Sequence, residues 1–244
     1  MAPWAGINAL DALISAYTSI SLLRQQTQPG DIIQGNITNG GIKPNIIHAY
    51  AAGNFVVRST SIVRLAVLKR RVEACFIAAA HATGAMLRMT PQGAYADHVP
   101  NRALGETYRT HFNTLGGSIP KAELDILAGT TMASTDQGDI SHALPSLSPG
   151  FWIRSEGPDR AQRGGPHTPD FAAAAGTMEA FELALRVGKA LAATAVDVLV
   201  KKGLLERIKK EFDEMKKAEE AALRAAEKVR DAFASDGAGK APHL

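Results

Sequence analysis

The chain has 244 residues, of which 45% are hydrophobic and 6% aromatic, and its 27 basic and 24 acidic side chains give a formal charge of +3. This length can bury a core in one large or two small domains, and the small charge surplus argues against a nucleic-acid-binding protein, which needs a clustered basic face. A single cysteine excludes an intramolecular disulfide and fits a reducing, cytoplasmic compartment. The first ten residues do not match a signal peptide, and no apolar run predicts a membrane span.

Hydrophobic periodicity divides the first hundred residues into five predicted elements. They are a helix at 8–26, a strand at 31–38, a strand at 46–58, a helix at 61–83 and a short strand at 85–90. In the second strand, Phe55 and Val57 would face one side, and Arg58 would face the other. The order helix, strand, strand, helix, strand is a split β-α-β or ferredoxin-like pattern that lacks its first strand. A sheet without that member has an unpaired edge, which proteins normally avoid.

The composition changes at about Asp97. A short helix is predicted at 101–116, and loops rich in Gly, Pro, Ser and Thr follow from 128 to 170. Residues 178–200 predict a long helix with apolar residues near one side, namely Phe181, Leu185, Ala192, Val196 and Leu199. Residues 203–233 predict an alanine-rich helix whose charges nearly cancel, which is typical of a solvated surface, and the last ten residues predict disorder.

Four motifs occur in a fixed order along the chain. They are APWAGINALDA from Ala2, NGGIKPNIIHAY…NFVVR from Asn39, STDQGDIS from Ser134 and HTPDFAAAAGTMEA from His167. From Ala2 to about Leu204 the chain resembles the metal-dependent aminoacylase and carboxypeptidase family (peptidase family M-twenty), particularly its β-alanyl-dipeptide hydrolase branch. The resemblance implies a zinc-dependent amidohydrolase that cleaves dipeptides or N-acyl amino acids. It also implies an α/β catalytic domain with two zinc ions and an inserted ferredoxin-like lid that forms the dimer.

The resemblance also suggests domain boundaries. Residues 1–96 would form the lid or dimerisation domain without its first strand, and residues 97–204 would form the C-terminal part of the α/β catalytic domain. Residues 205–244 would be a charged helix and tail. In the family, the strand that is missing here lies just before the first motif, so we expect this chain to begin partway through the hydrolase. Pairing through the lid, with itself or with a full-length paralogue, is the implied association.

The resemblance assigns substrate-binding roles to two residues of the lid. Asn45 and Arg58 match the family's lid asparagine and the arginine that ends the following strand. Such groups bind the substrate's carboxylate or polarise its amide carbonyl in the active site of the partner subunit. The chemistry is suitable, because a guanidinium pairs with a carboxylate and an amide donor stabilises an oxyanion. The alternative roles are a turn residue for Asn45 and a solvated strand end for Arg58.

Three further candidate residues lie in the second half of the chain. His167 matches the family's C-terminal zinc ligand, and neutral imidazole is a good zinc donor; its alternative role is an exposed loop histidine. Thr135 and Asp136 match a Ser-Thr-Asp turn that approaches the substrate, and their alternative is a local Asx-type turn. Surface positions are expected for the other histidines and an inert core thiol for the cysteine, that is, for His48, His81, His98, His111, His142 and Cys75.

The family's chemistry also needs a His-x-Asp pair, a bridging aspartate and adjacent glutamates, one of which is the general base. The adjacent glutamates of this chain, Glu219 and Glu220, lie in the charged tail. A catalytic zinc has about three protein ligands, so with His167 as its one candidate the chain alone is expected to be inactive. Three hypotheses stay open: a C-terminal piece of an amidohydrolase, a non-catalytic dimerisation or substrate-clamp module, and an adaptor that acts through the charged helix.

Overall fold

A computed structural model describes residues 2–122, 124, 133–154 and 165–237, with side chains described as far as residue 228. The chain divides into two compact units. The first unit comprises Met1–Asp97 and Glu219–Leu244, and the second comprises His98–Ala218. Helices together with a small sheet make this a mixed α and β protein, as the sequence predicts. Among the described residues, no helix has the length and apolar content of a membrane span.

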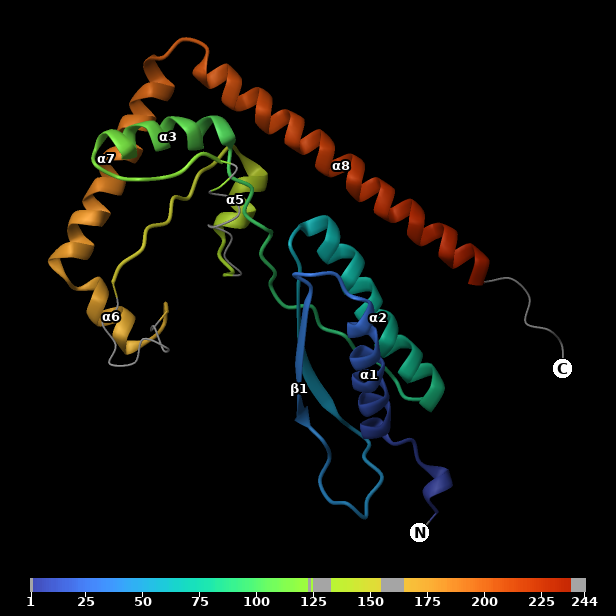
Figure 1. The fold of residues 1–244 in the computed structure, drawn as a ribbon. Coiled ribbons are helices and arrows are strands. Elements are labelled where there is room, and N and C mark those ends of the chain that lie inside the picture. Colours follow the sequence, from blue (N-terminus) through green and yellow to red (C-terminus); the bar gives the residue numbers. More distant parts are fainter. Residues whose placement is uncertain (1, 123, 125–132, 155–164, 238–244) are drawn as a thin grey trace. The chain divides into compact units, whose positions relative to one another are not determined.

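The first unit is a two-stranded sheet with two helices packed on one face (Figure 1). Its elements are η1 (Pro3–Ala5), α1 (Ala9–Leu23), η2 (Arg24–Gln26), β1 (Ile32–Asn39), β2 (Ala52–Arg58), α2 (Ile62–Thr83) and the last part of α8 (Leu204–Gly237). The strands are antiparallel, and their register runs from the pair Ile32–Arg58 to the pair Asn39–Ala52. The predicted helices at 8–26 and 61–83 and the strand at 31–38 are therefore confirmed. The ferredoxin-like assignment stays a prediction.

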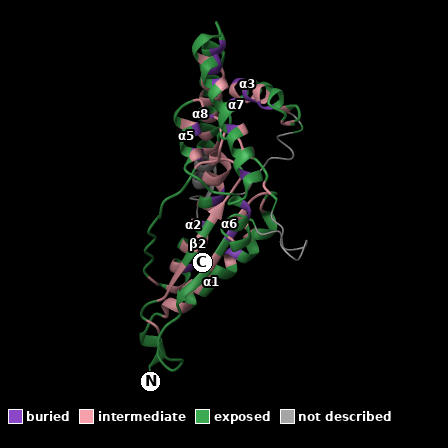
Figure 2. Cartoon of the chain, turned by 90° about the vertical axis from the view of Figure 1, so that its left-hand side faces the viewer, coloured by how far each residue is buried: buried purple, intermediate pink, exposed green. Residues whose placement is uncertain are grey.

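The core of the first unit lies between the sheet and the two helices. Ile20, Ile33, Leu68 and Val72 are buried there, and Phe55 and Val57 of β2 pack against them. The predicted facing of Phe55 and Val57 toward one side of the strand is thus confirmed. Burial of apolar area is the main favourable term in folding, and Figure 2 colours the chain by the burial of each residue.

The second strand is shorter than predicted, because residues 46–51 lie in a loop and β2 begins at Ala52. Pro44 has no N–H to donate to a sheet. The N–H of Ile46 donates to the carbonyl of Lys43 at 3.2 Å, and the carbonyl of His48 accepts the N–H of Ala9 at 2.8 Å. The backbone of this segment therefore forms hydrogen bonds outside the sheet.

The predicted strand at 85–90 is also wrong. Residues 85–101 contain neither helix nor strand, and Met86 is 98% exposed. Five of the six residues at 85–90 are exposed, so the segment has no buried face that would fix it against the sheet.

The second unit is helical wherever the structure describes regular elements. It contains α3 (Arg102–Thr114), α5 (Gln137–Ala143), α6 (Pro169–Ala175), α7 (Met178–Val200) and the first part of α8 (Leu204–Gly237). Tyr108 and Phe112 of α3 pack against Val187 and Ala190 of α7 to form its main core. A second cluster joins Ala103 of α3 to Leu204 and Ile208 of α8. The predicted helices at 101–116, 178–200 and 203–233 are confirmed.

One prediction for the second unit is corrected. Residues 137–143, expected as loop, form α5, which is anchored because the hydroxyl of the buried Ser141 donates to Gly138 O at 2.6 Å and accepts the N–H of Val99 at 3.0 Å. The apolar residues predicted near one side of α7 do share one side, but this side is exposed rather than buried against α3. The residues of α7 that are buried lie on the other side of the helix: Ala180, Val187, Ala190, Thr194 and Asp197.

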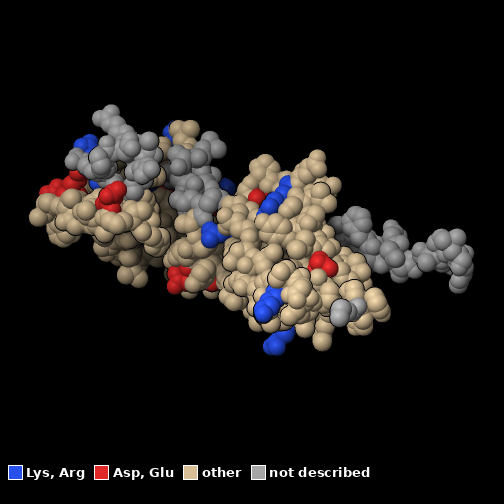
Figure 3. Space-filling model, turned by 90° about the horizontal axis from the view of Figure 1, so that it is seen from below, with Lys and Arg blue, Asp and Glu red and all other residues tan. Residues whose placement is uncertain are grey.

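Charged side chains are scattered on the face drawn in Figure 3, where Lys and Arg do not gather in one patch. This distribution agrees with the small charge surplus of the sequence.

Candidate functional site

Asn45 lies in the exposed loop at 40–51 that joins β1 to β2. The loop extends beyond the ends of both strands (Figure 1). Its second residue, Gly41, has a φ of 103°, which suits glycine. The loop is held to the start of α1 by the hydrogen bond from the N–H of Ala9 to His48 O. Asn45 is therefore a loop residue at the hairpin tip, rather than a strand residue.

Arg58 is the last residue of β2, where it lies opposite Ile32 at the other end of the hairpin. The six steps from Ala52 to Arg58 span roughly 20 Å at about 3.3 Å per residue, whereas an extended dipeptide spans only about 7 Å. The side chain of Arg58 is half-buried. The structure therefore does not bring Asn45 and Arg58 of one chain together around one small substrate.

An ion pair with a buried carboxylate organises the end of the hairpin at which Arg58 lies. The carboxylate of Asp31, whose side chain is 1% exposed, accepts hydrogen bonds from the Arg64 guanidinium at 2.5–3.2 Å. It also accepts the Ser59 hydroxyl at 2.7 Å and the Gln28 N–H at 3.0 Å. We call these four residues the Asp31 cluster. It ties the residue that follows Arg58 to the first turn of α2.

The hydrogen bonds of the Asp31 cluster decide the protonation of its carboxyl. Burial alone raises the pKa of Asp31, because it penalises the charged form. The donors on Arg64, Ser59 and Gln28 outweigh this effect and lower the pKa of Asp31 from its ordinary value of 3.8 to about 2. The group is therefore charged at neutral pH, and it compensates a positive charge on α2.

Thr135 and Asp136 form an exposed turn that leads into α5. The Thr135 hydroxyl donates to Asp136 Oδ1 at 3.2 Å and accepts the N–H of Gln137 at 3.4 Å. The N–H of Gly138 donates to Thr135 O at 3.3 Å. These local bonds are typical of Asx and Ser/Thr turns, so the alternative role has direct structural support, and the substrate-binding role stays a prediction.

His167 lies on an exposed loop directly before α6. Its φ of 72° makes it the non-glycine residue with a left-handed backbone in the part of the chain that the structure describes. The next residue, Thr168, explains how this conformation is held: its hydroxyl donates to Gly165 O at 2.8 Å and accepts the N–H of Phe171 at 3.2 Å. Residues held in this region cluster at functional sites, and histidine is among the residues that enter it most readily.

The described residues do not fit a complete zinc site. No group of three or more His, Cys, Asp and Glu side chains that could hold a metal ion occurs among them. A catalytic zinc has about three protein ligands, so His167 can supply at most one of them.

His111, for which a surface position was predicted, is half-buried and links α3 to α7. Its Nε2 lies 2.6 Å from Oδ2 of Asp197, and the ammonium of Lys201 lies 2.7 Å from the same oxygen. Lys201, and then His111, hold the pKa of Asp197 below its ordinary value. The sequence carries a weak signal for this cluster, because Asp197 interrupts an apolar helix and Lys201 follows it at i+4. The contact with His111 leaves no such signal in the sequence, because His111 and Asp197 are 86 residues apart.

The remaining titratable candidates give mixed outcomes. His81 is exposed, as predicted, whereas His48, His98 and His142 are half-buried. The Cys75 thiol donates to Arg71 O at 3.3 Å, and burial raises its pKa. A raised pKa disfavours the nucleophilic thiolate, so the prediction of an inert thiol beside the core is supported.

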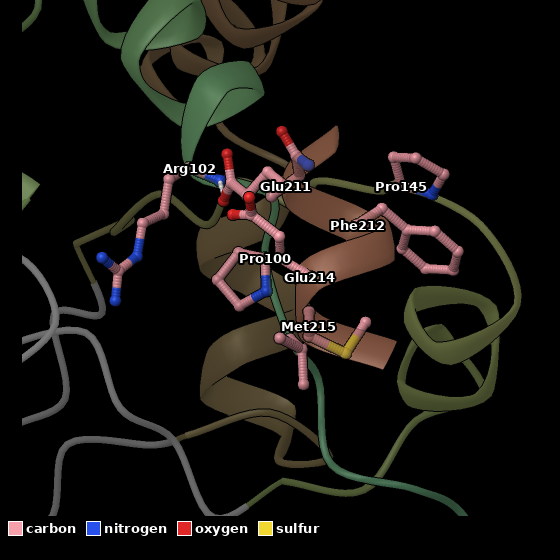
Figure 4. Close-up of a pocket in the computed structure, with 9 residues that line it drawn as sticks. Pro100, Arg102, Pro145, Glu211, Phe212, Glu214 and Met215 are labelled. Carbon is pink, nitrogen blue, oxygen red and sulfur yellow. Dashed lines mark hydrogen bonds between the residues drawn. The ribbon is translucent and has the colours of Figure 1, made fainter. Parts of the chain in front are cut away.

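A pocket of about 290 Å³ lies between α8 and the segment that enters α3 (Figure 4). The Glu211 carboxylate accepts the N–H groups of Arg102 at 2.5 Å and Ala103 at 3.0 Å, and so it caps the start of α3. Pro100, Phe212 and Met215 supply apolar walls to this pocket, which contains none of the predicted site residues.

No family model matches the chain. The chain is 39% identical over 211 residues to the Xaa-Arg dipeptidase of Mus musculus, an alignment that covers 86% of this chain and 47% of that protein. It is 39% identical over 212 residues to the Xaa-Arg dipeptidase of Homo sapiens, with 86% and 46% covered. The chain thus spans about half the length of the curated relatives it matches. Both relatives are dipeptidases, which supports the peptidase family that the four sequence motifs indicate.

Proposed function

We propose that this chain acts in the hydrolysis of dipeptides as part of a metal-dependent peptidase. The observation that carries the proposal is the 39% identity to two Xaa-Arg dipeptidases over 86% of the chain. Dipeptides with a C-terminal arginine are the proposed substrates. N-acyl amino acids, which share the amide bond and the free carboxylate, are the second class to test.

The role proposed for this chain is to bind the substrate. Arg58 would pair with the substrate's C-terminal carboxylate, and Asn45 would donate to the carbonyl of the scissile amide. Since these residues lie at opposite ends of the hairpin, one substrate would receive Asn45 from one copy and Arg58 from another. Two hairpins that pair antiparallel about a twofold axis place the tip of one beside the strand end of the other, which agrees with the association through residues 1–96 proposed from the motifs.

His167 is the proposed metal ligand of this chain, with zinc as the proposed ion. When bound, such an ion polarises a carbonyl or lowers the pKa of a water molecule. The described residues supply one such ligand, whereas a catalytic zinc has about three protein ligands. For the same reason, we propose that turnover needs ligands and a general base in addition to these residues.

A chimera tests the proposal. The matched segment of the mouse dipeptidase is replaced by the corresponding residues of this chain, and arginine release from alanyl-arginine is measured with added zinc. We expect release, and we expect Arg58→Ala to raise KM by about tenfold or more, because a hydrogen bond to a charged group contributes about 1.5–3 kcal/mol. Arg88→Ala, at an exposed arginine of the same unit, is the matched control. A folded chimera that releases no arginine contradicts the proposal.

A further inference from the structure

The loop that carries Asn45 is closed by a contact between two of its own residues, Gly41 and His48. The imidazole of His48 lies against the backbone of Gly41, so that a Cβ atom added there would overlap Nδ1, Cγ and Cε1 of the ring. The φ of Gly41 is 103°, a conformation that glycine adopts far more readily than a residue with a side chain. Both the space beside Gly41 and its backbone conformation therefore require glycine.

Each side of this contact is also held by hydrogen bonds to neighbouring elements. The N–H of Gly41 donates to Oδ1 of Asn39, the last residue of β1, at 2.9 Å. The carbonyl of His48 accepts the N–H of Ala9, the first residue of α1, at 2.8 Å. A Cβ atom added at Gly6 would lie 3.2 Å from Cγ2 of Ile47, so Ile47 packs on the segment before α1. The contact is thus fixed to both β1 and α1.

Asn45 lies on a turn between the two residues of this contact. The N–H of Ile46 donates to the carbonyl of Lys43 at 3.2 Å, which closes a β-turn with Pro44 at its second position and Asn45 at its third. Proline fixes its own φ and favours the second position of a turn, and asparagine is a common turn residue. The backbone of Asn45 is therefore set by the turn, and its side chain is exposed.

We infer that His48 is a positioning residue for Asn45, because its ring, packed on Gly41, fixes the turn that presents the Asn45 amide. One residue separates each end of the turn from the contact, namely Ile42 and Ile47, so the turn has little freedom to move independently of it. This inference rests on the proposed function, in which Asn45 donates to the carbonyl of the scissile amide. A donor that is held in place before the substrate binds needs no reorganisation during the reaction.

Hydrogen exchange on the full chain tests the contact without any assay of activity. His48→Ala removes the ring, and we expect the amides of Ala9 and Ile46 to exchange about tenfold faster or more, while the amides of α2 stay unchanged. Lys43→Ala, at an exposed side chain of the same loop, is the matched control and should leave both amides unchanged. Unchanged exchange of Ala9 and Ile46 in His48→Ala would overturn the inference.

A double-mutant cycle tests whether the ring and Gly41 touch in solution. Gly41→Ala should also speed the exchange of Ile46, both because its φ is strained and because the new methyl group overlaps the ring. In the His48→Ala background the overlap is gone and only the strain is left, so the same substitution should have a smaller effect. Equal effects of Gly41→Ala in the two backgrounds would also overturn the inference.

Kinetics on the chimera with the mouse dipeptidase test the role toward Asn45. His48→Ala should lower kcat for alanyl-arginine by about tenfold or more and change KM little, because a misplaced donor weakens the transition state more than substrate binding. The same substitution should have little further effect in an Asn45→Ala chimera, and a full loss there would contradict the positioning role. A chimera that releases no arginine, in a chain with the expected exchange pattern, supports the inference and contradicts the proposed function.

Discussion

The two units hold their charged groups in different ways. In the first unit, the Asp31 side chain is 1% exposed and accepts bonds from Arg64, Ser59 and Gln28. In the second unit, the polar anchors are more open: the side chains of His111 and Asp197 are 27% and 12% exposed, and Lys201 is 59% exposed. A buried charge that loses its partner is costly, whereas a solvated one is not. The first unit should therefore depend on one cluster, and the second on several weaker contacts.

The largest effect is expected from Asp31→Ala. It leaves the Arg64 guanidinium, whose side chain is 20% exposed, without its carboxylate partner, and the shift of the Asp31 pKa from 3.8 to about 2 corresponds to roughly 2–3 kcal/mol. Hydrogen exchange of the β1 and β2 amides measures the stability of this unit alone. Glu73→Ala is the control, because Glu73 forms an exposed i,i+4 pair with Lys69 at 3.7 Å that is worth less than about 1 kcal/mol. Equal losses in the two variants would show that the Asp31 cluster is not the support of the hairpin.

Low pH should remove part of the stability that Asp31 contributes to the first unit. The pKa of Asp31 is about 2 in the folded chain and 3.8 ordinarily, so the folded state favours the charged form. Its contribution to stability is complete above about pH 4 and is lost as the pH falls through 2. The difference in unfolding free energy between the natural chain and Asp31→Ala should therefore shrink from pH 4 to pH 2. A difference that stays constant over this range would contradict the assigned pKa.

In the second unit, Glu211→Ala should cost about 0.5–2 kcal/mol, the range for the loss of a helix cap. The N–H groups of Arg102 and Ala103 lose their acceptor in this variant. Exchange of the α3 amides measures the effect. Glu214→Ala lies one turn away in an exposed pair with Lys210 at 3.9 Å and should leave α3 unchanged. A larger loss than that of Asp31→Ala would reverse the contrast between the units.

The smallest expected effect is a difference in stability between two variants of His167. His167 has a φ of 72°, where a side chain costs about 1–2 kcal/mol that glycine does not pay. His167→Gly should therefore be more stable than His167→Ala by about 1 kcal/mol, measured by exchange of the α6 amides. If His167→Gly and His167→Ala are equally stable, the left-handed conformation stores no strain at this site.

Local signals were sufficient to predict the regular elements that carry their own caps. The bounds of α2 follow from Ser61, whose hydroxyl accepts the N–H of Arg64 at 3.2 Å, and from Gly84, whose φ is 72°. The start of β2 could not be predicted in this way. Residues 46–51 have the composition of a strand, but their backbone bonds to Lys43 and Ala9 instead. Tertiary pairing overrides β propensity in such segments.

In the candidate site too, features with a local sequence signal were predictable, and contacts between distant residues were not. The exposed loop position of His167 was predictable from its Gly-Gly-Pro and Thr-Pro neighbours, although its backbone conformation was not. The contact between His111 and Asp197 was missed, because the two residues are 86 positions apart and no periodicity links them. The face of α7 that packs on α3 could not be predicted from the sequence, because both faces of this helix carry apolar residues and the pattern alone does not select one.

The proposed dipeptide hydrolysis, with Arg58 on the substrate carboxylate, is tested most directly by a double comparison on the chimera. Values of kcat/KM are measured for alanyl-arginine and for its C-terminal amide, with Arg58 present and with Arg58→Ala. Loss of the carboxylate should lower kcat/KM by about tenfold or more when Arg58 is present, since a charge-assisted bond is lost, and by little when Arg58 is absent. Equal losses in both enzymes would contradict the assignment of Arg58 to the substrate.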